Sequence, residues 1–373
     1  MKAEPASAPA RPARVLHITL RADFTGGPLY AFKLARGLQG TVENFIACPP
    51  DRPLTQPFAD LVTPERICPV PERSFSIAAL LAMARFVRAN AIDIVHSHGK
   101  GAGLYARLLK PLTGVKVVHT FHGLHFQHYG KAARIAYRLT ERSLSMMSDA
   151  VIAVIDSEKA VAVHEGFAPA DTITVIRTGL EDVPALAHWP AAECVDVLHF
   201  SRFDVQKNFD AMLALARAAR DAGLAGRLRF LIVGHGPRRA EYEAMARADG
   251  TDGFFEFLGI VPDVGSVSAR CRALVSTSRW EGLPVAPLEA GLAGLFLALS
   301  RVPGHVELAL DESGAMLFDL DDTAQYAKVV ERLAGLRTWL AGDAHHRDLL
   351  AEAFSYPGMV AGHVALYGRL ITA

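Results

Sequence analysis

Cysteine is scarce in this chain. Only four of the 373 residues are cysteines, and they lie far apart at Cys48, Cys68, Cys194 and Cys271. No two of them have the Cys-x-x-Cys spacing of a redox motif or a thiolate zinc site, and they do not form the pattern of a disulfide-rich secreted domain. The cysteine content therefore fits a protein of a reducing compartment.

The chain also lacks long apolar runs and an excess of charge of either sign. No stretch of about 18 consecutive apolar residues occurs, so we predict no membrane span. Lys plus Arg and Asp plus Glu both total 39, a balance that argues against a general nucleic-acid-binding protein. Residues 1–13 are rich in Ala and Pro and lack the apolar segment of a signal peptide. We expect them to form a disordered tail and the protein to stay in the cytoplasm.

Apolar segments, in contrast, are abundant and recur regularly. Hydrophobic residues make up 51% of the chain, and runs such as RVLHITL (14–20) alternate little, which predicts parallel strands covered by helices on both faces. The pattern occurs twice, on either side of the Pro- and Ala-rich segment 181–194. We therefore predict an α/β protein with two doubly wound, Rossmann-like domains, over 14–185 and 186–355. Residues 356–373 should form a helix that packs back toward the N-terminal domain.

Glycine pairs follow two of the predicted strands. In open parallel sheets, ligands bind beyond the carboxyl ends of the strands. Gly26 and Gly27 precede a helix that we expect to start at Pro28, so their N–H groups can approach an anion, although a tight turn explains them equally well. A second turn contains Gly234, Gly236 and Pro237. We interpret it as scaffold that lines a nucleotide site, with the proline at the first position of the next helix.

Charged residues follow two other predicted strands. Arg202 and Lys207 lie in one loop and suit a diphosphate, because one offers a planar fork and the other a mobile point charge; the alternative is two solvated charges. Glu281 can accept hydrogen bonds from sugar hydroxyl groups. It precedes a turn of Gly282, Leu283 and Pro284. Glu289 falls in the apolar helix that follows, so we expect it to be partly buried and to bind a ribose diol, unless it forms a salt bridge on a solvated face.

Four histidines recur at every third position, at His119, His122, His125 and His128. The first is predicted on a strand and the others in its exit loop, so this spacing does not bring the side chains to one surface. No carboxylate or cysteine completes a site nearby, and we therefore predict no metal site.

The predicted helix 131–147 has a basic face. Its four cations are spaced by three, four and four residues, at Lys131, Arg134, Arg138 and Arg142. Residues at these spacings share one side of a helix. This face is either an ordinary solvated surface or a contact for anionic lipid headgroups or a lipid-diphosphate acceptor.

Several of these segments together resemble a known family. The Glu281–Glu289 pair and the segments SRFDVQKN, VGHGP and FLGIVPDV, at 201–208, 233–237 and 257–264, resemble the donor domain of the GT-B glycosyltransferases of family 4. The segments FTGGPLYAFKLARGL, IDIVHSHG and VVHTFHG resemble that family's acceptor domain. The chain departs from the family pattern at Ser201, where glycine is common, and at Thr178, where asparagine is typical.

The resemblance implies a GT-B fold with the active site in the cleft between the two domains. It also implies a retaining, metal-independent reaction of a nucleotide-sugar that needs no cofactor. In such a site Arg202 and Lys207 bind the diphosphate and Glu289 binds the ribose. Glu281 and the backbone after it hold the transferred sugar, and His122 faces that sugar as a catalytic residue.

We therefore interpret the chain as a retaining glycosyltransferase. It would move a sugar from a UDP- or GDP-linked donor to a glycan or lipid-linked acceptor in bacterial cell-surface polysaccharide synthesis, at the inner face of the membrane. A UDP-sugar 2-epimerase of the same architecture is one alternative, and it should carry further catalytic carboxylates. A non-catalytic sugar-nucleotide-binding protein is another. Product analysis with several nucleotide-sugars separates the three.

Overall fold

The computed structural model describes residues 11–338 and 344–372, except for residues 25, 125, 127–128, 182, 187–192 and 262. The chain divides into two compact units. The first comprises residues 1–179 together with residues 354–373, and the second comprises residues 180–353. Most of the predicted tail, 1–13, and much of the predicted junction, 181–194, lie outside the described residues.

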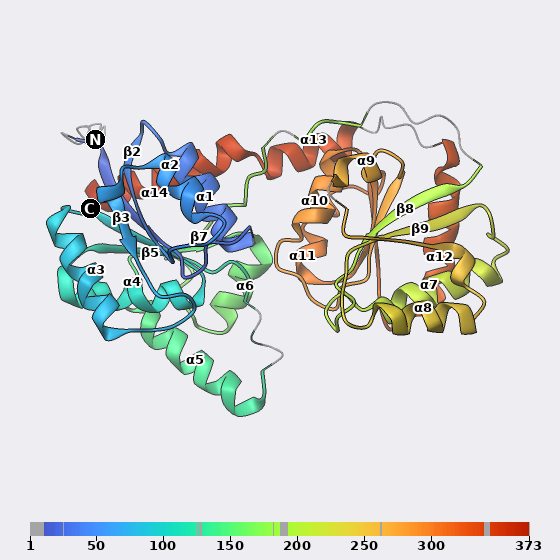
Figure 1. Cartoon of the computed structure of the whole chain (residues 1–373), viewed down its shortest axis with the longest axis horizontal. Coiled ribbons are helices and arrows are strands. Elements are labelled where there is room, and N and C mark those ends of the chain that lie inside the picture. The colour runs from blue at the N-terminus through green and yellow to red at the C-terminus, as the bar shows by residue number, and fades with distance from the viewer. Residues whose placement is uncertain are drawn as a thin grey trace. The chain divides into compact units, whose positions relative to one another are not determined.

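The first unit contains, in its described part, a parallel sheet of seven strands in the order β3-β2-β1-β4-β5-β6-β7 (Figure 1). The strands are β1 (Ala13–Ile18), β2 (Val42–Cys48), β3 (Ile67–Pro69), β4 (Ile94–His98), β5 (Lys116–Thr120), β6 (Ala150–Ala153) and β7 (Ile173–Val175). The helices are α1 (Gly26–Gly37), α2 (Thr55–Leu61), η1 (Pro64–Arg66), α3 (Ile77–Ala89), α4 (Lys100–Thr113), α5 (Lys131–Ser145), α6 (Asp156–His164) and α14 (Tyr356–Thr372).

Helices cover both faces of this sheet, as the apolar strands predict. Val95 and Val117 pack among residues of α3 and α4. Ile94 and Val118, which point to the other face, pack among residues of α1 and α14. The helix α14 approaches α1 so closely that a Cβ atom at Gly37 would lie 2.5 Å from the Val360 side chain. The end of the chain therefore completes the core of its first half.

The second unit has the same plan. Its described residues form a parallel sheet of six strands in the order β10-β9-β8-β11-β12-β13 (Figure 1). The strands are β8 (Val195–Phe200), β9 (Leu228–Val233), β10 (Phe255–Gly259), β11 (Ala273–Ser276), β12 (Phe296–Ser300) and β13 (Ala315–Phe318). The helices are α7 (Phe209–Asp221), α8 (Arg239–Ala248), η2 (Asp252–Phe254), α9 (Val264–Ser268), α10 (Val285–Leu292), α11 (Pro303–Val306), α12 (Ala324–Ala334), η3 (Gly335–Thr338) and α13 (Ala344–Ala353).

Each sheet has a point at which the strand order reverses. In the first unit the chain moves outward from β1 to β3 and then returns to place β4 beside β1. In the second unit it moves outward from β8 to β10 and returns to place β11 beside β8. Ligands of doubly wound sheets bind at such reversals. Among the described helices, none is both long and apolar enough to cross a bilayer.

Candidate functional site

The reversal in the second unit brings together two of the predicted site residues. Lys207 follows β8 and Glu281 follows β11, and Nζ of the lysine lies 2.7 Å from Oε1 of the glutamate. The same oxygen accepts a hydrogen bond from Ser278 Oγ at 2.7 Å. The lysine side chain is 20% exposed and the glutamate side chain 10%. A cation and an acceptor are thus held at the edge of the sheet, largely withdrawn from water.

Hydrogen bonds fix the two loops to each other. Asn208 has a φ of 50° and precedes α7, and its Oδ1 accepts a hydrogen bond from the Arg279 guanidinium at 2.8 Å. The backbone N–H of Arg279 donates to the carbonyl oxygen of Gln206 at 2.8 Å. Thr277 Oγ1 donates to the carbonyl oxygen of Lys207 at 3.0 Å. The lysine therefore leaves a backbone whose position is set by the neighbouring loop.

Arg202 occupies the solvent side of the same loop. Its side chain is 63% exposed, pairs with Asp204 at 3.0 Å and donates to Gln206 Oε1 at 2.6 Å. The amide nitrogen of Gln206 in turn lies 3.4 Å from Glu281 Oε2. Gln206 thus links Arg202 to Glu281, the partner of Lys207, and the sequence analysis did not identify it.

Glycines allow the loops to pack against one another. A Cβ atom at Gly234 would lie 1.9 Å from the carbonyl oxygen of Ser201, and one at Gly236 would lie 1.8 Å from that of Arg202. Gly234 also has a φ of 132°, which side chains with a Cβ rarely adopt. The loop after β9 therefore supports the loop after β8. In the same way, a Cβ at Gly304 would lie 1.6 Å from the carbonyl oxygen of Gly282.

The prediction for Pro237 is wrong in one respect. The helix α8 begins at Arg239, so Pro237 is not its first residue. Gly236, Pro237 and Arg238 form a turn instead, in which the Arg239 N–H donates to the Gly236 carbonyl at 3.2 Å. The helix starts two residues later than predicted, because Gly236 lies against the loop after β8 and the chain turns away from that loop before it becomes helical.

The expectation that Glu289 is partly buried is wrong. Glu289 is exposed. The buried residues of α10 are Pro287, Leu288, Ala290, Gly291 and Leu292. At 100° per residue, Glu289 stands in the middle of the narrow face that remains, between Val285 and Ala286. The apolar sequence reflects burial of the other sides, and the glutamate occupies the place where this helix meets solvent.

A buried histidine that the sequence analysis missed lies beneath the same loops. Nδ1 of His305 lies 2.9 Å from the carbonyl oxygen of Ser300, and Ser300 Oγ donates to the carbonyl oxygen of Ser278 at 2.7 Å. Burial lowers the pKa of His305 to about 4. Its Nε2 atom has no hydrogen-bond partner within the described part of the chain. The neutral ring supports the loop that carries Glu281.

In the first unit, His122 follows β5 at the sheet edge. It is half-buried and has a φ of 59°. The Glu158 carboxylate fixes the loop by accepting hydrogen bonds from the N–H groups of Gly123 at 2.5 Å and Val154 at 2.8 Å. Burial raises the pKa of Glu158 to about 7. A Cβ atom at Gly27 would lie 3.6 Å from the His122 ring, so the glycine and the histidine adjoin.

The glycine pair lies inside α1 and not before it. This helix begins at Gly26, two residues earlier than predicted. N–H groups in the first turn have no intrahelical acceptor, so Gly26 and Gly27 still present donors, now from the start of the helix. The predicted anion contact through backbone N–H groups remains a prediction.

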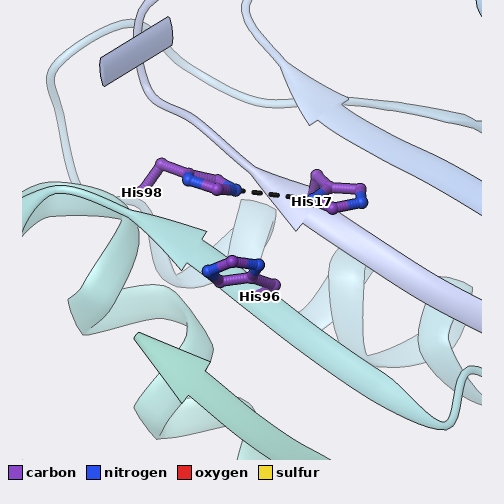
Figure 2. A group of neighbouring side chains, drawn as sticks. All are labelled: His17, His96 and His98. Atoms are coloured by element: carbon purple, nitrogen blue, oxygen red, sulfur yellow. Dashed lines mark hydrogen bonds between the residues drawn. The ribbon is translucent and has the colours of Figure 1, made fainter. Parts of the chain in front are cut away.

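Three further histidines lie in the interior, and Figure 2 shows how they are arranged. His17 from β1 and His96 and His98 from β4 are buried, and their nearest ring nitrogens all lie within 4.8 Å of one another. Side chains alternate along a strand, so His96 and His98 share one face of β4. His119 is paired in register with Ser97, and its Nδ1 lies 2.9 Å from Ser97 Oγ on the opposite face.

The two described members of the periodic histidine pattern, His119 and His122, have different partners. His119 contacts Ser97, whereas Nε2 of His122 lies 3.1 Å from His98 Nδ1. His125 and His128 lie outside the described residues. The sequence analysis did not identify the cluster of His17, His96 and His98, which comes from two different strands.

The basic face predicted for α5 is partly used within the protein. Arg138 forms an ion pair with Glu165, and Arg142 Nε donates to the carbonyl oxygen of Glu165 at 2.8 Å. The apolar residues Ile135, Leu139 and Met146 are instead 56%, 59% and 85% exposed. The outward surface of α5 is therefore an apolar stripe beside the cations.

The two halves of the chain match two glycosyltransferase families. Residues 25–179 match the glycosyl transferase 4-like domain, and residues 195–335 match glycosyl transferases group 1. The UDP-Gal:alpha-D-GlcNAc-diphosphoundecaprenol alpha-1,3-galactosyltransferase of Escherichia coli is 25% identical over 68% of this chain and 70% of its own length. The GDP-mannose:cellobiosyl-diphosphopolyprenol alpha-mannosyltransferase of Xanthomonas campestris is 27% identical over 65% of this chain and 64% of its own length.

Solved structures share the fold over nearly the whole chain. HepE of Anabaena, in complex with UDP and glucose, has a TM-score of 0.77 and 15% identity, and the match covers 96% of this chain and 100% of that one. The lipopolysaccharide outer core galactosyltransferase WaaB, in its apo form, has a TM-score of 0.75 and 15% identity over 95% and 99% of the two chains. These likenesses confirm the predicted architecture of two Rossmann-like domains.

Proposed function

The chain belongs to the group 1 glycosyltransferases, and from this membership we propose that it transfers a sugar from a nucleoside-diphosphate sugar with retention of anomeric configuration. The relatives in Escherichia coli and Xanthomonas campestris are named for UDP-galactose and GDP-mannose and for acceptors linked to a diphospho-polyprenol. We extend the same classes of donor and acceptor to this chain. Its product would then be an intermediate of cell-surface polysaccharide synthesis.

The observation that carries the proposal is the Lys207–Glu281 pair at the strand-order reversal of the second unit. As the sugar leaves, negative charge grows on the diphosphate, and a fixed cation stabilises it. The loop that carries Lys207 is hydrogen-bonded to the loop after β11, and this supports a fixed position for the lysine. Arg202 is exposed and adds a second cation from the solvent side. The backbone after Glu281 and the glutamate itself would hold the transferred sugar.

Glu289 would bind the ribose. Its carboxylate lies on the exposed face of α10, and a carboxylate can accept hydrogen bonds from the two hydroxyl groups of a diol. Its exposure removes the desolvation cost that a buried carboxylate would carry. The surrounding residues of the helix are buried, so its position is rigid.

We also propose that α5 contacts an anionic membrane surface during acceptor binding. Ile135 and Leu139 of the helix, together with Met146 directly after it, form an exposed apolar stripe, and Lys131 at the start of the helix is also exposed. Helices that lie in a membrane interface combine an apolar face with flanking cations. This contact would hold the enzyme at the surface where lipid-linked acceptors are found.

Incubation with a panel of nucleotide-sugars and a polyprenyl-diphosphate-linked sugar tests the proposal. Transfer, with the anomeric configuration of donor and product compared by NMR, is the expected result. An isomerised donor without transfer would indicate a 2-epimerase, and binding without turnover would indicate a non-catalytic protein. Inversion at the anomeric carbon would refute the retaining mechanism alone.

A further inference from the structure

Four polar side chains of the first unit form a continuous chain that ends at His122. Asn44 Oδ1 lies 3.2 Å from His17 Nε2. His17 Nδ1 lies 3.4 Å from His98 Nε2, and Figure 2 marks this contact with a dashed line. His98 Nδ1 then lies 3.1 Å from His122 Nε2. The first three members are 4%, 1% and 6% exposed. The chain therefore runs from the interior of the sheet to the half-buried residue at its edge.

The direction of every hydrogen bond in this chain is set at its inner end. Asn44 Nδ2 donates to the carbonyl oxygen of Ala35 at 2.8 Å. A backbone carbonyl can only accept, so the amide nitrogen of Asn44 must face it and the amide oxygen must face His17. That oxygen also can only accept. The proton between Asn44 and His17 therefore belongs to His17 Nε2.

The remaining protons follow from this one, because a neutral imidazole carries a single N–H. With Nε2 of His17 protonated, its Nδ1 accepts from Nε2–H of His98. His98 Nδ1 then accepts from Nε2–H of His122. The Nδ1 atom of His122 is left as a lone-pair acceptor, and the hydrogen bond that His122 makes to the described residues uses its Nε2 atom.

The imidazoles are neutral because they are buried together. Burial lowers the pKa of His17 and of His122 to about 3. The pKa of His98 lies well below its ordinary value through burial and through the neighbouring imidazoles, of which His122 has the largest effect. All three rings therefore carry one proton each near pH 7.

A metal ion held by His17, His96 and His98 is a weaker explanation of the cluster. Both ring nitrogens of His96 are already engaged, Nδ1 with Tyr367 Oη at 2.6 Å and Nε2 with Thr120 Oγ1 at 2.8 Å. A cation would have to break these contacts and the His17–His98 bond. No carboxylate among the three would offset its charge in the interior. The hydrogen-bonded chain, in contrast, uses every ring nitrogen of His17 and His98.

We propose that Asn44, His17 and His98 are positioning residues that hold His122 in its Nε2–H tautomer, so that its Nδ1 accepts a hydrogen bond from a sugar hydroxyl group. This inference rests on the proposed function for the identity of the ligand. The opposite tautomer would present an N–H to that hydroxyl and would leave two acceptors facing each other between His98 and His122. The hydrogen-bonded chain thus selects a ligand group that donates a hydrogen bond to Nδ1 of His122.

The tautomers can be measured without any substrate. In protein labelled with ¹⁵N-histidine, long-range ¹H–¹⁵N correlation spectra at pH 7 show which nitrogen of each imidazole is protonated. We expect protonated Nε2 and bare Nδ1 in His17, His98 and His122. Signals are assigned by single His→Gln substitutions. A protonated Nδ1 in His122 overturns the proposal, and this test needs no variant of Asn44.

Variants of Asn44 test the link to the reaction. Asn44→Leu removes the oxygen that accepts from His17 Nε2–H, so both tautomers of His122 should be populated. We then expect kcat to fall about tenfold, which is the effect of losing one hydrogen bond. KM for the donor should stay within about twofold of the wild-type value. Asn44→Asp, which burial favours in its protonated form, keeps an oxygen that accepts from His17 and an O–H that donates to the Ala35 carbonyl oxygen, so it should restore both the spectrum and kcat. His119→Gln, a buried histidine outside the chain, is the matched control and should change neither.

The outcomes separate this proposal from the proposed function. If the wild-type enzyme transfers no sugar, the proposed function fails while the tautomer spectrum still tests the hydrogen-bonded chain. If Asn44→Leu mixes the tautomers without lowering kcat, the positioning role is wrong and the transferase assignment stands.

Discussion

Replacing Lys207 by methionine tests two separate effects of the Lys207–Glu281 pair, one on turnover and one on the free energy of unfolding. Methionine keeps an apolar stem and removes the cation, which leaves a carboxylate that is only 10% exposed. Removing one partner of a fully buried pair costs about 3–5 kcal/mol. Ser278 and Gln206 still donate to this carboxylate, and Lys207 itself is 20% exposed. We therefore expect the free energy of unfolding to fall by about 1–3 kcal/mol.

The activation free energy of transfer should rise by more than the free energy of unfolding falls. A fixed donor to charge that develops in the transition state is worth about 10²–10³ in rate. The double variant Lys207→Met, Glu281→Gln removes both charges, so it should regain most of the lost stability while turnover stays low. Arg202→Ala is the matched control in the same loop. Its side chain is 63% exposed, so we expect it to change the free energy of unfolding by less than about 0.5 kcal/mol but to lower turnover.

Urea unfolding followed by circular dichroism and single-turnover transfer assays measure the two effects. Wild-type turnover in Lys207→Met would refute the diphosphate role of the lysine. A double variant that is no more stable than Lys207→Met would refute the account of the stability loss as an unpaired carboxylate. The two refutations are independent, because the first concerns the transition state and the second concerns the free protein.

Three further predictions use other parts of the structure. Glu289→Gln should weaken UDP or GDP binding by about 1–3 kcal/mol in calorimetry. It should change the free energy of unfolding by less than about 0.5 kcal/mol, since the residue is exposed. Unchanged affinity contradicts the ribose role. Serine at Ile135, Leu139 and Met146 should reduce sedimentation with anionic vesicles; equal sedimentation of wild type and variant, or indifference to lipid charge, contradicts the membrane contact. Burial lowers the pKa of His17 and His122 to about 3, so the free energy of unfolding should be full above pH 6.5 and should decline as pH falls toward about 3. Burial also lowers the pKa of His363 to about 4, so His363→Gln should make the free energy of unfolding decline less steeply with falling pH. An unchanged steepness would show that the His363 ring takes up a proton freely in the folded state.

The sequence predicts the fold, and it predicts that Lys207 and Glu281 lie at the same edge of a sheet, because both depend on local signals. Apolar runs without alternation identify strands that are buried on both faces, and residues just after such strands lie at the ligand-binding edge. Lys207 and Glu281 were found in this way, and their contact follows from the adjacency of β8 and β11.

Other features depend on contacts that periodicity does not encode. Glu289 was expected to be partly buried because its helix is apolar, but the composition of a helix does not tell which residue faces solvent. The chain from Asn44 to His122 draws on four segments, and it exists because β4 lies beside β1 in a register that sets His96 opposite His17. Only the order of strands in the sheet brings these residues together.

The return of α14 to the first unit has a consequence for synthesis. The ribosome delivers residues 180–353 as one continuous segment, so the second unit can fold as soon as that segment has emerged. The sheet of the first unit is made earlier. Its core lacks Met359, Leu366 and Tyr367 until α14 has been made, and these side chains pack with apolar residues of β1, β4 and β5. During translation the apolar face that α14 covers therefore remains open while residues 180–353 are made, and the first unit completes its core only after the whole of the second unit has been made.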